Sequence, residues 1–368
     1  MTEKEAYVAF NLTENIGSVR LSSLVARYGS VAAAWETYPD KRSRIGQGEV
    51  DWRREIAKAN AIGVELVTPA DTELYPKQLL SVPGHPLCLY VKGDAKVLSR
   101  ASVAIVGTRR ATQYGLDQAY RFGRDLAAGG WAIVSGLALG IDAEAHRGAL
   151  AAKGGIAIGV IGSGLNCFYP EANIPLAGEI IKHGGAVVSE FPFGRKPDQT
   201  TFPQRNHVVA ALAKGIIAIE APVKSGTLIT ASIAMELGRT VMAVPGRVDS
   251  QASSGCLKLI RDGAILVRSP GDVESDLGDF FPPSQKATPD AAAKAEPAAD
   301  NTGIRPQPVL SAEEMLFLKA LRPEGVSIDE IIRETQLPAA KANALSMSLL
   351  MKGRVRMLQN GCVAPPRD

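Results

Sequence analysis

Short runs of consecutive apolar residues alternate with helix-like segments through the middle of the chain, between residues 101 and 270. Such runs indicate strands that are buried on both faces, because a half-exposed strand would alternate apolar and polar residues. The segments between them carry Ala and Leu at helical spacing. We expect strands at residues 103–106, 132–134, 156–161, 186–188, 215–220, 241–244 and 265–267, and helices at residues 118–128, 143–152, 172–182 and 228–237.

Buried strands that alternate with helices predict a parallel sheet covered by helices on both faces. With right-handed crossovers this is an α/β fold, a Rossmann-like, doubly wound, mostly parallel sheet. Residues 71–100 are interrupted by Pro and Gly, and the run L-C-L-Y-V-K at 87–92 predicts one further strand there. We therefore assign residues 71–280 to this central domain.

The first 70 residues have a helical pattern and predict a separate N-terminal domain. Gly17 and Gly29 interrupt the pattern, and the intervening segment resembles a helix-hairpin-helix or SAM-like module. In a helix-hairpin-helix, a glycine turn can offer backbone N–H groups to a DNA phosphate. The alternative is a small helical bundle that only packs against its neighbour, and a single weak copy of the motif favours this second interpretation.

The C-terminal part predicts a linker followed by a winged-helix domain. Residues 281–308 contain many Ala and Pro and almost no large apolar residue, so we expect a flexible linker. Residues 309–368 predict a capped helix, helices at 327–335 and 339–352, and a hairpin around Asn360–Gly361. The helix at 339–352 takes the recognition position, yet its only cations are Lys341 and Lys352. We therefore favour protein docking over sequence-specific duplex reading for this domain.

The composition of the 368 residues narrows the compartment and the chemistry. The N-terminus is charged and lacks an apolar core, and no run approaches the ~20 residues of a membrane span, so we expect a cytoplasmic protein without membrane association. Four scattered cysteines without C-x-x-C spacing fit a reducing compartment. The four histidines show no metal-binding spacing, and we expect neither a metal nor a cofactor.

The candidate chemistry lies in loops that follow the predicted strands. In a doubly wound sheet these loops line one crevice at the carboxyl edge, where glycine turns and helix starts bind phosphate. The first turn carries two adjacent arginines, which favours a polyanion as the ligand. The candidate binding residues are Gly107, Thr108, Arg109, Arg110, Gly136, Phe202, Arg205, Asn206, His207, Lys224, Ser225, Gly226 and Thr227.

The loop after residue 188 is the sharpest indication of the ligand. It places Phe191, Phe193 and Phe202 among three cations, Arg195, Lys196 and Arg205. Aromatic rings that stack on bases, beside cations that follow the backbone, are typical of single-stranded nucleic-acid sites. The alternative for each phenylalanine is packing in the core, which we favour for a given ring except Phe202, where the two interpretations are evenly balanced.

An ordinary dinucleotide-binding enzyme fits the sequence less well. The first turn, G-T-R-R-A-T-Q-Y-G, departs from the dinucleotide pattern G-x-G-x-x-G, and no acidic residue stands where a ribose ligand is expected. The sequence pattern places no nucleophile–base pair and no carboxylate pair. Asp142, Glu144 and His146 cluster at a helix start, where helix capping and a satisfied polar contact are the favoured interpretation.

At these loops the sequence resembles the DNA-processing protein A family, DprA/Smf. The resemblance covers about residues 75–267 and rests on motifs in one order: V-A-I-V-G-T-R-R, I-V-S-G-L-A-L-G-I-D-A-E-A-H, G-L-N-C-F-Y-P, S-E-F-P, F-P-Q-R-N-H, E-A-P-V-K-S-G-T-L-I-T-A and V-P-G. The resemblance implies a non-enzymatic protein that binds and protects single-stranded DNA and helps to load the RecA recombinase in natural transformation. It also implies a homodimer formed through the Rossmann-like domain. The family's DNA pocket would correspond here to Arg109 and to Phe202, Pro203, Arg205 and Asn206.

Two departures from the family pattern lower the expected positive charge. His207 stands where the family usually has a third arginine, and Gln199 to Thr201 supply no cation where some members have a lysine. Arg110, Arg195, Lys196 or Lys224 can compensate. An alternative function is a nucleotide-cleaving enzyme of the lysine decarboxylase-like phosphoribohydrolase type. Its P-G-G-x-G-T-x-x-E motif is only partly matched by P-V-K-S-G-T-L-I-T, which lacks the double glycine and the glutamate.

Overall fold

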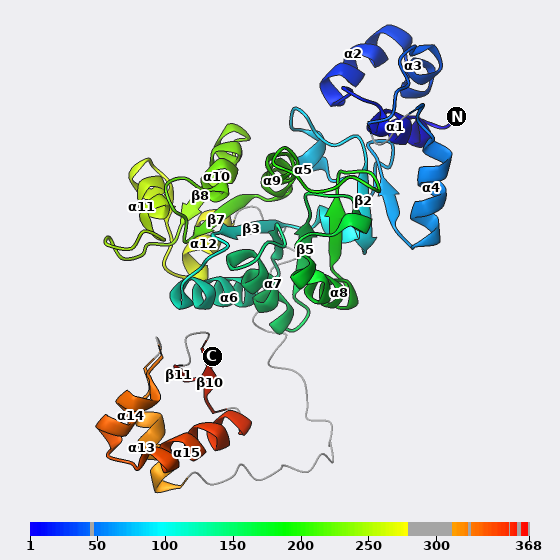
Figure 1. Ribbon diagram of the computed structural model, residues 1–368. Helices are drawn as coiled ribbons and strands as arrows, with labels where there is room; N and C mark the ends of the chain where they lie inside the picture. Colours follow the sequence, from blue (N-terminus) through cyan, green and yellow to red (C-terminus); the bar gives the residue numbers. More distant parts are fainter. Residues whose placement is uncertain (45–47, 279–310, 323–324, 353, 359–361, 367–368) are drawn as a thin grey trace, which may run out of the picture. The chain divides into compact units, whose positions relative to one another are not determined.

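Figure 1 shows the computed structural model of the chain. It describes residues 1–44, 48–278, 311–322, 325–352, 354–358 and 362–366. The chain divides into two compact units, Met1–Ala287 and Thr288–Asp368. The predicted linker at 281–308 and the predicted turn at Asn360–Gly361 lie outside the described residues, and the three boundaries between the four predicted segments stay predictions.

A nine-stranded sheet forms the middle of the larger unit, in the order β1-β2-β6-β5-β4-β3-β7-β8-β9. Strands β3 to β9 are parallel to one another, whereas β1 pairs antiparallel with β2, and β2 pairs antiparallel with β6, at one edge. The fold-class prediction is confirmed, and a strand occurs at each predicted position. The strands are β1 (Glu65–Val67), β2 (Leu89–Gly93), β3 (Ser102–Gly107), β4 (Ala132–Ser135), β5 (Ile156–Val160), β6 (Ala186–Ser189), β7 (Gly215–Ile219), β8 (Thr240–Ala243) and β9 (Ile265–Leu266).

Helices cover both faces of this sheet (Figure 1). α5, α9, α10 and α11 enclose one apolar core with the strands, and α6, α7, α8 and α12 enclose the other. Both strand faces are therefore buried, which is why the strands are apolar at consecutive positions. These helices are α5 (Lys77–Leu80), α6 (Gln113–Ala128), α7 (Ile141–Ala151), α8 (Ile174–Lys182), α9 (Thr201–Leu212), α10 (Gly226–Glu236), α11 (Ser254–Arg261) and α12 (Pro270–Leu277).

The strand order changes direction between β3 and β7, which lie side by side. Strands β3 to β6 run outward on one side of this point, and β7 to β9 run outward on the other. The connections from β3 and β7 therefore leave in opposite directions and open a crevice at the carboxyl edge. Ligands of open α/β sheets bind in such a crevice.

Four helices precede the sheet: α1 (Glu3–Leu12), α2 (Ser18–Tyr28), α3 (Val31–Thr37) and α4 (Trp52–Ala61). The helices α1 and α4 pack against its β1–β2 edge, and α3 packs between α1 and α2 (Figure 1). Phe10 meets Trp35 and Tyr38 edge-on inside these helices, with ring centroids 5.2 and 5.6 Å apart. Leu12 joins Tyr90 of β2 in a second apolar cluster. The predicted helical N-terminal segment is thus observed, and α2 lies between Gly17 and Gly29, the two glycines that interrupt the helical pattern of the sequence.

The smaller unit contains α13 (Ala312–Lys319), α14 (Ile328–Thr335), α15 (Ala339–Met351) and the paired strands β10 (Arg356–Met357) and β11 (Val363–Ala364). Three helices followed by a two-stranded ribbon confirm the winged-helix order. Phe317, Ile331 and Leu349 form its apolar core. Two ion pairs join α15 and its end to α13, Lys341–Glu313 and Lys352–Glu314, each at 2.5 Å.

A search of the described helices for a membrane span gives none, because each is too short or too polar to cross a bilayer.

Candidate functional site

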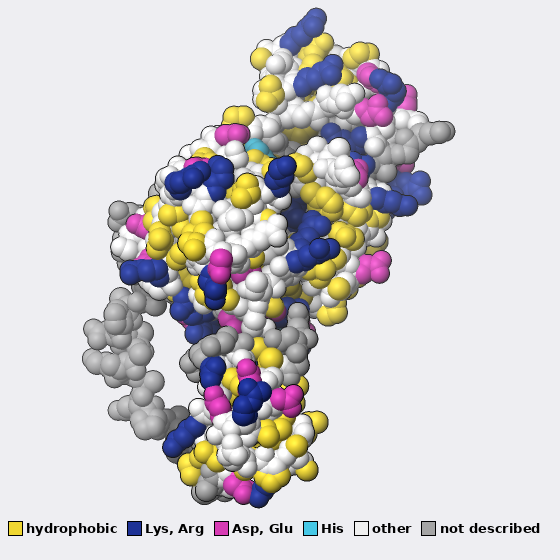
Figure 2. All heavy atoms as spheres, turned by 60° about the vertical axis from the view of Figure 1, so that its left-hand side comes forward, with side chains coloured by type: hydrophobic (Ala, Val, Ile, Leu, Met, Phe, Trp, Pro, Cys, Tyr) yellow, Lys and Arg dark blue, Asp and Glu magenta, His cyan; other side chains and the backbone are white. Residues whose placement is uncertain are grey.

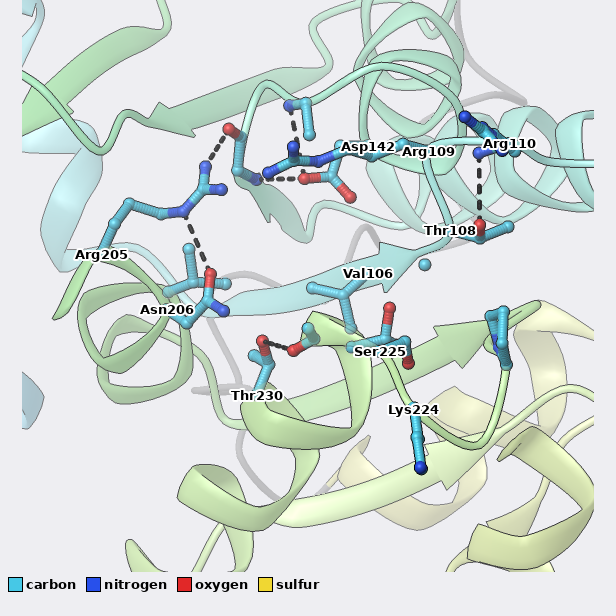
Figure 3. A pocket seen from close by; sticks show the side chains of 17 residues that line it. Val106, Thr108, Arg109, Arg110, Asp142, Arg205, Asn206, Lys224, Ser225 and Thr230 are labelled. Atoms are coloured by element: carbon cyan, nitrogen blue, oxygen red, sulfur yellow. Dashed lines mark hydrogen bonds between the residues drawn. The ribbon is translucent and has the colours of Figure 1, made fainter. Parts of the chain in front are cut away.

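A pocket of about 310 Å³ opens at the carboxyl edge of the sheet, at the point where the strand order reverses (Figure 3). It collects loops that are far apart in the sequence. Of the predicted site residues, Phe202 and His207 are outside its lining. The lining is Val106, Gly107, Thr108, Arg109, Arg110, Gly136, Ala138, Asp142, Arg205, Asn206, Val209, Pro222, Lys224, Ser225, Gly226, Thr227 and Thr230.

The arginine turn after β3 is held by Glu220, which follows β7. The Thr108 amide donates to the Glu220 carbonyl at 2.8 Å, and the Glu220 carboxylate accepts the Thr112 amide at 2.8 Å and the Thr112 hydroxyl. Both ends of the turn are thereby fixed to the neighbouring strand. Arg109 and Arg110 are exposed on it, and neither has an ion-pair partner within the described ranges.

The loop after β4 packs directly on this turn. Gly140 has φ +76°, and a Cβ there would come within 2.5 Å of the Thr108 carbonyl oxygen. Glycine is therefore required for both its conformation and its size. The Asp142 carboxylate accepts the Gly136 and Ala138 amides at 3.0 and 3.4 Å. Burial raises the pKa of Asp142, while Arg205 and these amides act in the opposite direction.

Arg205 lies buried at the pocket floor, with 6% of its surface exposed. Its Nη1 donates to the Gly136 carbonyl and, at 2.8 Å, to the Val160 carbonyl, and its Nε donates to Asn206 Oδ1 at 3.1 Å (Figure 3). Burial lowers the pKa of Arg205, and Asp142 opposes this shift. The guanidinium thus ties the ends of β4 and β5 together beneath the exposed arginines, and its role as a DNA contact stays a prediction.

The predicted aromatic residues separate into two groups. Phe191 and Phe193 are 3% and 4% exposed, so the favoured interpretation, packing in the core, holds for both rings. Phe202 is half-buried, and the Arg109 guanidinium carbon lies 5.1 Å from its ring centroid. Phe202 therefore contacts a pocket residue without lining the pocket itself.

His207 lies on α9 outside the pocket lining and is half-buried. Burial is the main cause that lowers its pKa, and Glu236 acts in the opposite direction. The imidazole is therefore neutral at neutral pH and adds no positive charge at this position.

The opposite wall of the pocket is the start of α10. Ser225 precedes the helix without a side-chain capping bond, and its hydroxyl has no partner among the described atoms. Gly226 has open space around its Cα. The first amides of an uncapped helix carry partial positive charge and attract anions. Lys224 stands exposed beside them, without an ion-pair partner in the described ranges.

The acidic residues near the pocket serve structure. Asp142 bonds the loop amides, and Glu144 forms an ion pair with Arg147 at 2.5 Å. His146 is completely buried, and this burial lowers its pKa to about 3. The described residues contain no group of three or more His, Cys, Asp or Glu side chains arranged to hold a metal ion.

Three positions that organise this region were not identified from the sequence. They are Glu220, Asn173 and Tyr169. Asn173 donates to the Leu137 and Ala138 carbonyls at 2.8 and 3.1 Å, which joins the loop before α8 to the loop after β4. The ring centroid of Tyr169 lies 6.1 Å from that of Phe202. Glu220 has φ +50°, an uncommon value for a non-glycine residue, but the sequence carries no signal for it.

Comparison with known proteins identifies the family of this chain. The family described as DNA recombination-mediator protein A matches residues 65–278, and the DprA winged helix domain matches residues 287–361. Protein Smf of Synechocystis sp. is 31% identical over 389 residues, which cover 96% of each chain. The chain belongs to the DprA/Smf family. DNA processing protein DprA of Streptococcus pneumoniae is 42% identical over 205 residues, or 56% of this chain and 72% of that protein.

Two solved DprA structures share the fold. The X-ray structure of DprA from Streptococcus pneumoniae superposes with a TM-score of 0.63 at 31% identity, over 75% of this chain and 98% of that chain. A DprA structure from Helicobacter pylori has a TM-score of 0.53 at 29% identity, over 60% of this chain and 97% of that chain. The latter was described for its single-stranded DNA binding mode.

Proposed function

We propose that this DprA-family protein binds single-stranded DNA in the pocket at the carboxyl edge of its sheet and acts as a recombination mediator without catalytic turnover. The observation that carries the proposal is the charge of the pocket rim. Arg109, Arg110 and Lys224 are exposed there, and no acidic side chain neutralises them within the described part of the chain. Unpaired cations beside helix amides favour phosphate.

The arrangement of aromatic and cationic groups favours a single strand as the ligand. Phe202 and Arg109 form a cation–π pair beside the pocket, and a base can stack on such a platform only when it is unpaired. The space-filling view shows a face where Lys and Arg side chains lie next to hydrophobic ones (Figure 2). The similarity to the Helicobacter pylori protein supports the same ligand class.

A binding role also agrees with how the carboxylates are used. Asp142 accepts backbone amides, and Glu220 accepts the Thr112 amide and hydroxyl, so both are engaged in holding loops. We accordingly assign the S-G-T helix start at Ser225, Gly226 and Thr227 to phosphate binding rather than to nucleotide cleavage.

We further propose that the protein transfers the strand to the RecA recombinase in the cytoplasm and works as a homodimer through the Rossmann-like unit, as the family resemblance implies. One feature supports the dimer. The edge strand β9 exposes Ile265 and Leu266 by 37% and 44%, and exposed apolar edge strands favour pairing. Analytical ultracentrifugation of Ile265→Lys tests this: a shift from dimer to monomer is expected, and a monomeric wild type contradicts it.

The DNA-binding proposal is tested by fluorescence anisotropy with labelled oligo-dT. Arg109→Ala should weaken binding about tenfold or more for all sequences alike, because a phosphate contact and the stacking platform are lost together. Arg53→Ala is a matched control: Arg53 is also exposed and lies 4.5 Å over an aromatic ring, that of Trp52 on α4. Equal affinities for the two variants, or no oligo-dT binding by the wild type, would reject the proposal.

A further inference from the structure

A second groove of about 610 Å³ lies beside the DNA pocket and is lined by the segment between β5 and α8. Phe168, Tyr169 and Ile174 give it an apolar wall, and Lys196 stands on its other side. Tyr169 and Ile174 are 46% and 50% exposed, so this wall presents adjacent apolar surface that a ligand can cover. This groove is separate from the pocket that Arg109 lines.

Phe202 connects the two cavities. Its ring lies 5.1 Å from the Arg109 guanidinium carbon on one side and 6.1 Å from the Tyr169 ring centroid on the other. The two rings are inclined by 53°, so Tyr169 does not cover the face of Phe202. A cation and two rings thus follow one another from the first pocket into the groove.

The segment that carries Tyr169 is held in place by bonds to two loops, the one after β6 and the one after β4. Asn166 accepts the Gly194 amide at 2.8 Å, and the Gly164 amide donates to the Arg195 carbonyl at 2.8 Å. Asn173 donates to the carbonyls of Leu137 and Ala138, next to the first pocket. The exposed tyrosine is therefore preorganised, and its ring loses little freedom when a ligand covers it.

The groove offers one cation to a phosphate. Lys196 is exposed and has no ion-pair partner in the parts of the chain that the structure describes. Glu171 also lines the groove and is the carboxylate that a phosphate would have to avoid. An aromatic face with a cation nearby is how a base and its phosphate are bound without sequence preference.

We propose that this groove is a second nucleotide subsite, in which Tyr169 stacks on a base and Lys196 contacts its phosphate. The proposal rests on the DNA-binding function proposed above and extends the strand past Phe202. The occupant is the same single strand that fills the first pocket, because the chain of Arg109, Phe202 and Tyr169 runs between the two cavities without interruption.

The experiment uses the full chain and a series of oligo-dT lengths, from strands that fill one subsite to strands that fill both. Tyr169→Ala should leave the affinity for the shortest binding strand unchanged and weaken the longer ones about tenfold, which is the loss of one stacked base. Tyr169→Phe should restore the wild-type affinity, since the ring face is retained. Lys196→Ala should make the salt dependence shallower by about 0.7 in slope.

Abasic substitution gives a second and independent measurement. Removing one base at a time from a long strand should identify a position where the loss weakens the wild type but not Tyr169→Ala. Tyr28→Ala is the matched control, because Tyr28 also lies beside an arginine, with Arg27 5.4 Å from its ring, but on α2. Circular dichroism and thermal unfolding verify that each variant is folded.

The outcomes separate the two proposals. If Arg109→Ala weakens every strand while Tyr169→Ala weakens none, the subsite is rejected and the DNA-binding function stands. If the wild type binds no strand, both fail. If Tyr169→Ala changes the sedimentation of the protein but not its DNA affinity, the groove contacts another copy of the chain and the subsite is likewise rejected.

Discussion

The pocket of the larger unit and the α15 surface of the smaller unit both carry cations, but the cations of the pocket rim are exposed without ion-pair partners among the residues that the structure describes, whereas those of α15 are paired with glutamates. At the pocket, Arg109 and Lys224 are exposed and unneutralised within the described ranges. On the smaller unit, Lys341 and Lys352 are bonded to two glutamates of α13. A phosphate that approached this surface would have to replace a carboxylate already in place. Whether the cations of a domain are free or ion-paired is therefore a better guide to nucleic-acid binding than the fold of that domain.

The pocket contains a second contrast, between its surface and its floor. Arg109 is exposed above Arg205, which is buried and bonded to the Gly136 and Val160 carbonyls. Two arginines in one site thus have different tasks: the upper one is available to a ligand, and the lower one holds the loops together.

The largest expected effect tests this division of tasks. Arg205→Ala should lower the free energy of unfolding of the larger unit by about 2–4 kcal/mol, because the buried carbonyls of Gly136 and Val160 lose their donor. Denaturant titration followed by tryptophan fluorescence measures it, since Trp35, Trp52 and Trp131 all belong to that unit. Arg109→Ala should change stability by less than about 0.5 kcal/mol. Equal destabilisation by the two substitutions would contradict the contrast.

The next effect is a pH dependence that only the larger unit should show. Burial holds the pKa of His146 at about 3, below the value of about 6.5 for an unfolded chain. The unfolded state then binds the proton first, so this stability is present above pH 6.5 and is lost as the pH falls, by at most about 1.4 kcal/mol per unit. His146→Leu should flatten the slope between pH 6.5 and 5.

The control for this measurement is the smaller unit, whose sequence contains no histidine. Its far-UV circular dichroism should be insensitive to pH over the same range. An identical pH slope in wild type and His146→Leu would show that the imidazole is not protected from protonation in the folded protein.

A smaller effect concerns the charge at the start of α10. Lys224→Ala should weaken oligo-dT binding a few-fold and reduce the slope of log K against log salt by about 0.7, because one fewer phosphate is neutralised. Lys153→Ala is the control, since Lys153 is also exposed but precedes β5 at the opposite edge of the sheet. Matching slopes for the two variants would place the strand away from α10.

The smallest effect is expected on α15. The double substitution Lys341→Ala and Lys352→Ala should change the affinity for oligo-dT by less than twofold, because both cations are already paired with acids. Anisotropy titration of the full chain measures it. A loss as large as that of Arg109→Ala would mean that the smaller unit contributes its own phosphate contacts, and the comparison of the two units would fail.

The strands of the sheet were predictable because burial on both faces leaves a plain apolar run. Strand β1 was not, because Glu65–Val67 is short and follows a helical segment directly. The helix α9 was also missed, because its first turn contains a proline and this segment was predicted to be a loop. Length and neighbouring Pro residues thus limited the prediction more than composition did.

The sequence predicted which residues lie at the candidate site better than it predicted the role of each residue. Phe191, Phe193 and Phe202 have similar sequence neighbours, but only the Phe202 ring stays accessible to a ligand after the chain has folded. A signal for the burial of Arg205 did exist: it shares helical spacing with Val208 and Leu212, both buried. Tyr169 carried no comparable signal, because its exposure depends on bonds that come from distant loops.

Glu220 gives the site a property that the loop sequences alone do not suggest. Its carboxylate, anchored at the end of a central strand, sets the path of the neighbouring turn from Thr108 to Thr112. The charges that this turn displays at Arg109 and Arg110 are therefore carried on a backbone whose shape is specified elsewhere. Charge and shape can be changed independently at this site, which makes the turn a natural place to retune affinity for a polyanion without rebuilding the fold.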